Sequence, residues 1–341
     1  MIGKKSTKPV AVIDIGTNTV LSLVARKSGK GLQVLDEAQQ LPRLGQGVDH
    51  HRIISSEAID RLLEALRYHQ KRIRTRFGEI DITVTATSAM RDAENREEVI
   101  HRIRQETAWD VLLLSGGQEA EAMFQGAMHM LDPAKFYGST AVTVIDIGGG
   151  STELALGKLS RSDGDVHPDL QKRESLNAGC VRFTEQYFFG KATVMAESEK
   201  KARPGFRPTP GLLNAMELLK TRTKEMVNAV DFTADAAVGV AGTITSLAYM
   251  LRAGTGPYRP EAINGSVITV GEIRKMIDRI SCMPVDHIVE KWPVVMKGRA
   301  DIFLAGLLIL ETCLAHLKME EITVSTGGLR HGILFNVMNT A

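Results

Sequence analysis

The hydrophobic and polar positions of this chain follow two alternating patterns. Short apolar runs rich in β-branched residues, such as VAVIDI at 10–15, predict buried strands. Longer segments with apolar residues every three or four positions predict amphipathic helices, and the clearest of these covers 55–78. Ser55 or Ser56 is placed to cap the start of that helix, and Gly78 is placed to end it. Strands that alternate with helices predict an α/β protein.

The first half of the chain opens with three consecutive strand patterns. The runs at 10–15, 19–26 and 32–39 are separated by short turns, so we expect a three-stranded antiparallel meander. The helix at 55–78 comes next. The pattern then predicts a strand at 81–87, a second amphipathic helix that carries Val99, Ile100 and Ile103, a buried strand at 111–115, and a helix at 116–131.

The second half repeats this order. Strand patterns at 140–150, 151–159 and 173–179 precede a helix-like segment at 180–190. After a proline-rich break at 203–211 we expect a helix at 212–230, a strand at 236–242, a helix at 243–251, a helix around 299–317, a strand at 321–328 and a closing helix at 329–338. Each half is therefore a meander followed by alternating helices and strands, which predicts a duplicated α/β domain.

A segment with proline, glycine and polar residues at 131–138 divides the two halves. We accordingly expect a first lobe at 1–132 and a second lobe at 133–341. The last helices are candidates to pack back on the first lobe.

The sequence Val-Ile-Asp-Ile-Gly occurs once in each half, at the end of the first strand. Glycine leaves backbone N–H groups open to a close anion, so both turns predict phosphate binding. The predicted phosphate-binding residues of the two turns are Gly16, Thr17, Asn18, Gly148, Gly149, Gly150 and Ser151. Asp14 and Asp146 end the two strands and are placed to hold a hydrated Mg²⁺.

Other interpretations of these turns are weaker. One such turn alone is equally well explained as a tight hairpin with an exposed aspartate, but two matched copies favour a shared function. The chain has no GxxxxGK[ST] loop, and a strand rather than a helix follows each glycine turn, which excludes the dinucleotide fingerprint.

Composition narrows the class of protein. A length of 341 residues predicts two domains, and a formal net charge of +2 argues against a surface that binds polyanions over the whole protein. Three scattered cysteines form no CxxC motif, which favours a reducing cytoplasm. The apolar runs are too short for a membrane span or a signal peptide.

Eight blocks, in order along nearly the whole chain, resemble the exopolyphosphatase/guanosine pentaphosphate phosphohydrolase (Ppx/GppA) family. They are DIGTNT, ATSAMRDAENREE, SGGQEAEAMFQGA, VIDIGGGSTELALG, AGCVRFTEQYF, GVAGTITSLA, RADIFLAGLLIL and VSTGGLRHGIL. The resemblance implies the duplicated actin-like, or ribonuclease H-like, ATPase fold of the actin, Hsp70 and sugar-kinase superfamily, with two lobes and a cleft between them. Longer members carry an additional HD-type domain, and we expect this chain to be the short, two-domain form.

The family removes the terminal phosphate of inorganic polyphosphate, or the 5′-terminal phosphate of pppGpp, with Mg²⁺ and a water molecule. The resemblance implies that Glu119 is the general base, at the start of the helix after Ser115. Gln118 stands where family members often carry a second glutamate. The resemblance places Ser115 and the following glycines near a phosphate. Without the resemblance, the preferred interpretation of Glu119 is a first-turn residue that merely favours the helix dipole.

Further roles come from the same resemblance. Asp146 and Glu153 match the family's metal-associated carboxylates, with Asp14 as their counterpart from the other half, and K⁺ is a candidate activator. Arg91 matches an arginine that would grip phosphate, with a surface salt bridge as the alternative. The remaining phosphate candidates are Gly242, Thr243 and, more weakly, Arg43.

Several residues receive no functional role. Arg182 lies in a family block without an assigned function, Cys180 suits a small core residue, and His50 and His51 suit a surface loop. A groove for a long polyanion would need cations beyond the terminal site, and the clustered candidates are Lys191, Lys200, Lys201, Arg203 and Arg207.

These observations lead to an exopolyphosphatase as the first hypothesis, with inorganic polyphosphate as its substrate. A pppGpp 5′-phosphohydrolase has the same chemistry, and the motifs do not separate the two. A non-catalytic sensor of pppGpp or ppGpp is a third hypothesis, which Glu119 argues against. A kinase or filament protein is the fourth. We expect no nucleic-acid or membrane partner, and homodimerisation stays open.

Overall fold

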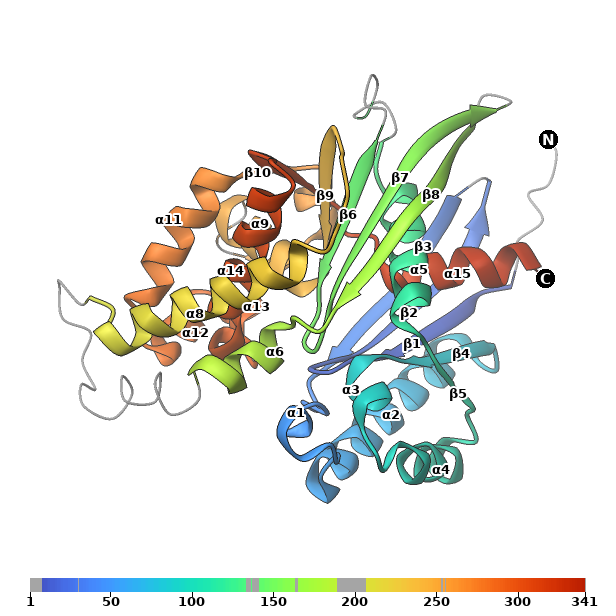
Figure 1. Cartoon of the computed structure of the whole chain (residues 1–341). Helices are drawn as coiled ribbons and strands as arrows, with labels where there is room; N and C mark the ends of the chain where they lie inside the picture. The colour runs from blue at the N-terminus through green and yellow to red at the C-terminus, as the bar shows by residue number, and fades with distance from the viewer. Residues whose placement is uncertain are drawn as a thin grey trace. The chain divides into compact units, whose positions relative to one another are not determined.

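The computed structural model describes residues 8–29, 31–132, 136, 141–162, 165–188, 207–252, 254 and 256–340. The chain forms two compact units, each built around its own sheet (Figure 1). Unit 1 comprises Met1–His129 with Gly327–Ala341, and unit 2 comprises Met130–Thr326.

The sheet of unit 1 contains the predicted meander. Strands β1 (Val10–Ile15), β2 (Val20–Ser28) and β3 (Gly31–Gln40) pair antiparallel in sequence order. On its other side β1 pairs in parallel with β4 (Asp81–Ala86), which pairs in parallel with β5 (Val111–Leu113). The order is β3-β2-β1-β4-β5, so the strand that ends at the first glycine turn is the central one.

Helices pack on this sheet because their apolar stripes face it. The longest is α2 (Ser56–Phe77), whose start is capped by Ser55 and whose end is marked by Gly78 in a positive-φ conformation. Both predictions for this helix are therefore confirmed. The other helices of unit 1 are α1 (Val48–His51), α3 (Ser88–Asp92), α4 (Arg96–Thr107), α5 (Gly116–His129) and α15 (Leu329–Thr340).

Helices α5 and α15 approach each other so closely that only glycine fits at two positions. A Cβ atom on Gly332 would lie 1.8 Å from the carbonyl oxygen of Ala122, and one on Gly126 would lie 2.0 Å from that of Gly328. Backbone therefore packs directly against backbone, and α15 fixes the position of α5 within unit 1.

The sheet of unit 2 repeats the same plan. Strands β6 (Val142–Ile147), β7 (Thr152–Ser162) and β8 (Asp165–Leu176) form an antiparallel meander. The second half of the sheet consists of β9 (Ala236–Val240), β11 (Glu321–Val324) and β10 (Val267–Thr269). The order β8-β7-β6-β9-β11-β10 reproduces that of unit 1 with one added antiparallel strand, β10, at the edge. The predicted duplicated α/β fold is confirmed.

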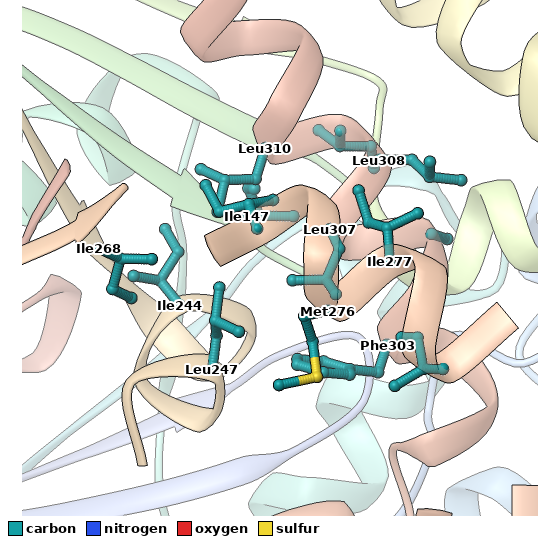
Figure 2. Packing of buried hydrophobic residues seen from close by; sticks show 14 of the residues in the cluster. Ile147, Ile244, Leu247, Ile268, Met276, Ile277, Phe303, Leu307, Leu308 and Leu310 are labelled. Atoms are coloured by element: carbon teal, nitrogen blue, oxygen red, sulfur yellow. The ribbon is translucent and has the colours of Figure 1, made fainter. Parts of the chain in front are cut away.

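A large apolar core fills unit 2. Its central element is α14 (Ala300–His316), which packs between the sheet and the other helices; Figure 2 shows Phe303, Leu307 and Leu310 of α14 within this cluster. Within the described part of unit 2, the other helices are α6 (Cys180–Phe183), η2 (Thr184–Phe188), α8 (Pro210–Val227), α9 (Ala241–Arg252), α10 (Pro260–Ile263), α11 (Val270–Ser281), α12 (Val285–Lys291) and α13 (Pro293–Met296).

The structure corrects the prediction for 111–115. The predicted buried strand is a short edge strand, and Leu112 is 53% exposed. A run of leucines predicts burial on both faces, but β5 has a neighbour on one side only. The pattern also missed the elements between 260 and 296. Of these elements, the start of α11 was predictable from the sequence, because Thr269 and Glu272 have the spacing of a capping box and form one in the structure.

Candidate functional site

The first glycine turn joins β1 to β2 and is held from one side by residues 43–45. The amide of Gly45 donates to the carbonyl of Thr17 (2.8 Å), and the amide of Arg43 donates to that of Asn18 (3.1 Å). A Cβ atom on Gly45 would lie 2.2 Å from the Cγ2 atom of Thr17. Gly45 is therefore required for the backing of this turn, and the sequence analysis did not identify it.

Helix α3 lies between this turn and Glu119 within unit 1 and contacts both. The hydroxyl groups of Thr17 and Ser88 are 2.9 Å apart, and Ser88 begins α3. One turn further along α3, the Nη1 atom of Arg91 donates to a carboxylate oxygen of Glu119 and to the carbonyl of Leu114 (2.9 Å). Helix α3 thus contacts the predicted phosphate turn through Ser88 and the carboxylate of Glu119 through Arg91.

Glu119 is buried in spite of its charge. It is 6% exposed and lies in the first turn of α5, where the ion pair with Arg91 orients its carboxylate. The side chain of Arg91 is 25% exposed. The ion pair that the structure shows for Arg91 is therefore with the buried carboxylate of Glu119. Buried carboxylates are rare unless paired, and Glu119 is paired.

Gln118 has a clear structural role at the start of α5. Its side-chain oxygen accepts from the amide (2.9 Å) and the hydroxyl (3.0 Å) of Ser115, and its amide donates to the hydroxyl of Ser115 (3.3 Å). This capping box explains why glutamine is tolerated here. It also engages the donors of Ser115, whose role in phosphate binding stays a prediction.

Asp14 lies in the same unit, at the carboxyl end of the central strand. It is 9% exposed, and the hydroxyl of Thr85 on the neighbouring strand β4 is 3.4 Å from its Oδ1 atom. The carboxylate is therefore held in a polar, largely buried setting rather than on an open surface.

The second glycine turn, between β6 and β7, is held by the start of α6. The amides of Val181 (2.8 Å) and Arg182 (3.1 Å) donate to the carbonyl of Gly149, and the amide of Cys180 donates to that of Gly148 (2.9 Å). The Nε atom of Arg182 donates to the carbonyl of Gly150 (2.8 Å). Arg182, which received no role from the sequence, thus supports the turn.

Gly179 allows this contact between α6 and the turn. A Cβ atom there would lie 2.3 Å from the carbonyl oxygen of Gly149 and 2.4 Å from the carbonyl carbon of Gly150. The burial of Cys180 raises the pKa of its thiol to about 12, which argues against a nucleophilic role and agrees with the prediction of a small core residue.

Asp146 and Glu153 come together in unit 2. They are directly opposite each other in the antiparallel pair of β6 and β7, so their side chains share one face of the sheet. Glu153 is 4% exposed and accepts from the hydroxyl of Ser175 (2.8 Å). The alternative of a solvent-facing strand residue is therefore wrong for Glu153.

The donor set of this pair fits Mg²⁺. Within the described ranges no cluster of three or more histidine, cysteine, aspartate or glutamate side chains could hold a metal ion. Magnesium usually takes one or two protein carboxylates and completes its octahedron with water and substrate phosphate, so two adjacent carboxylates suffice. Asp14 belongs to the other unit.

Gly242 and Thr243 begin α9 in unit 2. A Cβ atom on Gly242 would lie 2.4 Å from the Nη1 atom of Arg299, which also donates to the hydroxyl of Ser246 (3.2 Å). Burial lowers the pKa of Arg299, and the nearby thiol of Cys180 opposes that shift. Thr243 packs against Gly306. The sequence did not single out Arg299, because its position depends on this tertiary contact.

The weaker predictions are placed as follows. Arg43 has a positive φ of 52° beside the first turn. His50 and His51 are exposed, as predicted, but they lie in α1 and not in a loop. Lys191, Lys200, Lys201 and Arg203 lie outside the described residues, and Arg207 is exposed. Among the described residues, no helix is long and apolar enough to cross a membrane.

Two sheets of the same strand order, each with a glycine turn and an aspartate at the end of its central strand, define an actin-like protein with two candidate phosphate sites. The comparison with protein families is consistent with a protein that acts on phosphate. Residues 23–341 match the model of the Ppx/GppA phosphatase family, and the chain belongs to that family.

Similar proteins come from several bacteria. A Haemophilus influenzae protein named "Putative exopolyphosphatase" is 27% identical over 333 residues, which is 97% of this chain and 92% of that protein. The crystal structure of the Aquifex aeolicus family member is 27% identical with a TM-score of 0.74, and covers 98% of both chains. An exopolyphosphatase structure from Cytophaga hutchinsonii, 21% identical with a TM-score of 0.76 over 98% and 99% of the two chains, shows the likeness of fold alone.

Proposed function

We propose that this protein is a Mg²⁺-dependent exopolyphosphatase that hydrolyses the terminal phosphoanhydride of inorganic polyphosphate, with Glu119 as general base. The observation that carries the proposal is that α3 contacts the first glycine turn through Ser88 and holds the buried carboxylate of Glu119 through Arg91. Membership of the Ppx/GppA phosphatase family supports the reaction class, and the similarity to the Haemophilus influenzae protein supports the substrate.

The chemistry assigned to Glu119 is the activation of water. The carboxylate orients a water molecule and accepts its proton while the water oxygen bonds to the terminal phosphorus and the bond to the bridging oxygen breaks. The products are orthophosphate and a chain shorter by one phosphate. A carboxylate fixed by an ion pair is already oriented before substrate binds, so little reorganisation accompanies the reaction.

Arg91 has two candidate tasks at this site. In the structure its guanidinium holds Glu119 and the carbonyl of Leu114. A planar guanidinium has five donors, so an interaction with a phosphate oxygen is compatible with one that holds Glu119. We therefore retain the phosphate role and add a positioning role.

The glycine turns would bind the phosphates of the substrate. The amides of Gly16 and Gly148 donate to carbonyls within the turns (both 2.9 Å). Other backbone N–H groups of the turns and the side chains of Thr17, Asn18 and Ser151 would supply the donors, and Gly242 and Thr243 are further candidates. The carbonyls of Gly148, Gly149 and Gly150 already accept hydrogen bonds from the α6 segment. This arrangement fixes the orientation of the peptide groups, which supports a preformed anion cradle.

Asp146 and Glu153 would hold the magnesium ion, and the metal role of Asp14, which belongs to unit 1, stays a separate prediction. When bound, the ion supplies positive charge that offsets the charge of the phosphate oxygens. Ser175 orients Glu153 by its hydrogen bond, as outer hydrogen-bond donors of metal-binding carboxylates commonly do.

A pppGpp 5′-phosphohydrolase is the second candidate, because the family includes that activity and the same groups would perform it. The deciding experiment compares initial rates of orthophosphate release from long-chain polyphosphate and from pppGpp, each with Mg²⁺ and with EDTA. The proposal predicts Mg²⁺-dependent release with a higher kcat/KM on polyphosphate. A higher kcat/KM on pppGpp would select the second candidate. Binding of pppGpp without release from either substrate would select the sensor.

A further inference from the structure

The chain passes between its two units at only two points. Unit 1 ends at His129 and resumes at Gly327, so the connections lie at residues 129–130 and 326–327. Any movement of one unit relative to the other has to change backbone conformation at or near these two connections, because they are the covalent links between the units.

One side chain is bonded to the unit 2 end of both connections. The Nδ2 atom of Asn264 donates to the carbonyl of Met130 (2.8 Å). The Oδ1 atom of the same amide accepts from the backbone amide (2.9 Å) and the hydroxyl (3.2 Å) of Thr326. Met130 and Thr326 are the first and last residues of unit 2, so a single amide group bridges the two points where the chain leaves that unit.

Asn264 is itself firmly anchored in unit 2. Its backbone N–H group donates to the carbonyl of Pro260 (2.9 Å), and this hydrogen bond closes α10. The next residue, Gly265, donates to the carbonyl of Val324 (2.7 Å) at the end of β11, and its φ of 72° is one that glycine adopts without strain. The amide of Ser325 donates to the carbonyl of Gly239 in the sheet (2.8 Å). The bridge is therefore attached to the sheet of unit 2 rather than to a loose loop.

The chemistry of the bridge requires an amide side chain. One end must accept from the N–H group of Thr326, and the other must donate to the carbonyl of Met130. Aspartate can accept from Thr326, but it has no donor for Met130 and would place a negative charge beside a carbonyl oxygen. Alanine lacks both groups. Asparagine is thus the side chain of this length that satisfies both partners.

We propose that Asn264 is a hinge clamp that fixes the spacing of the two connections and so restricts the range of positions that the two units adopt. This role goes beyond the proposed hydrolysis and does not depend on it. Without the clamp, the segments at Met130 and Thr326 would move independently of each other, and the relative motion of the units would increase.

The test measures the distribution of distances between the units by pulsed electron paramagnetic resonance. Spin labels are attached to cysteines introduced at the exposed positions Leu112 in unit 1 and Leu213 in unit 2, in a background in which the three native cysteines are replaced by serine. The distribution of the otherwise wild-type protein is the reference. Asn264→Ala should broaden or shift it, and Asn264→Asp should have an intermediate effect. Asn228→Ala, at an exposed asparagine at the end of α8, is the matched control and should leave it unchanged.

Hydrogen exchange gives a second, local readout. In Asn264→Ala we expect the amide of Thr326 to exchange about fivefold faster, which corresponds to the loss of one hydrogen bond of about 1 kcal/mol. Thermal unfolding of the variant identifies a temperature at which it is fully folded. A hinge clamp predicts a broadened distance distribution at that temperature, whereas a purely structural role predicts an unchanged one. If Asn264→Ala does not fold, Asn264→Asp is measured in its place. Distributions identical to wild type in folded Asn264 variants would overturn the proposal.

Discussion

Replacement of Gly179 by alanine perturbs the second glycine turn with a single methyl group. The φ and ψ of Gly179 are −126° and 156°, which alanine adopts without strain, so the effect is one of space alone. The added Cβ would lie 2.3 Å from the carbonyl oxygen of Gly149, whereas real Cβ atoms almost never come within 3.0 Å of a neighbour. The turn and the start of α6 must therefore separate by about 0.7 Å, the difference between these two distances.

That separation has two measurable consequences. It lengthens the hydrogen bonds from Val181 and Arg182 to Gly149, and crowding of a packed site typically costs about 1–3 kcal/mol of unfolding free energy. It also moves the proposed phosphate cradle. Since a displacement of about 1 Å in a positioning group can reduce turnover about 100-fold, we expect kcat/KM to fall roughly 10- to 100-fold.

The assay measures initial rates of orthophosphate release together with urea unfolding for Gly179→Ala. The matched control is Gly271→Ala in the first turn of α11, where the nearest atom to an added Cβ is 3.9 Å away. The control should retain wild-type kcat/KM, and its unfolding free energy should be at or up to about 1 kcal/mol above that of wild type. Wild-type kcat/KM in Gly179→Ala would refute the inference that the turn, in the position held by α6, belongs to the site.

Three further predictions concern other parts of the molecule. His69 is fully buried between Ser22 (2.9 Å) and the carbonyl of Val20 (3.3 Å), and desolvation lowers its pKa to about 4. As the pH falls, this histidine takes up its proton in the unfolded chain before it does so in the folded protein. The unfolding free energy should therefore fall by about 2 kcal/mol between pH 7 and pH 5 because of this group. In His69→Gln, urea unfolding at several pH values should lack that part of the pH dependence. Gly332→Ala should lower the unfolding free energy by at least about 2 kcal/mol, because its Cβ would overlap the carbonyl of Ala122 on α5; an unchanged urea midpoint would show that α15 shifts without cost. Asp146→Asn should raise the Mg²⁺ concentration for half-maximal activity at least about tenfold, and an unchanged Mg²⁺ titration would remove Asp146 from the metal site.

The sequence predicted the parts of the fold that depend on local patterns. The repeated Asp-Ile-Gly turn marks the end of the central strand in both units, because a β-branched run followed by glycine has the same local preference in each copy. Helix α2 was predicted from its cap to its last residue for the same reason. The strand at 111–115 was predicted as buried because a run of leucines does not reveal that β5 lies at a sheet edge.

The candidate site was predicted less completely than the fold. Glu119 and Glu153 came from the resemblance to a family, whereas Asp146 was also indicated by its position at the end of a strand. The burial of Glu119 and Glu153 and the pairing of Asp146 with Glu153 became visible only in the structure. Gly45 and Arg182 were missed because each acts on a turn that is distant in the sequence. No periodicity or propensity encodes such contacts.

The role of Gln118 differed in this respect. Serine followed three residues later by glutamine is the signature of a capping box, so the sequence contained the information that Gln118 serves the start of α5.

The most direct test of the account measures orthophosphate release and substrate binding in the same preparation of Glu119→Gln. The amide keeps the shape of the side chain but cannot accept a proton from water, so we expect kcat to fall by at least about 100-fold while the dissociation constant for polyphosphate changes by less than about threefold. Glu98→Gln, another first-turn glutamate on the exposed face of α4, should behave as wild type. Near wild-type kcat in Glu119→Gln would contradict the assignment of the general base.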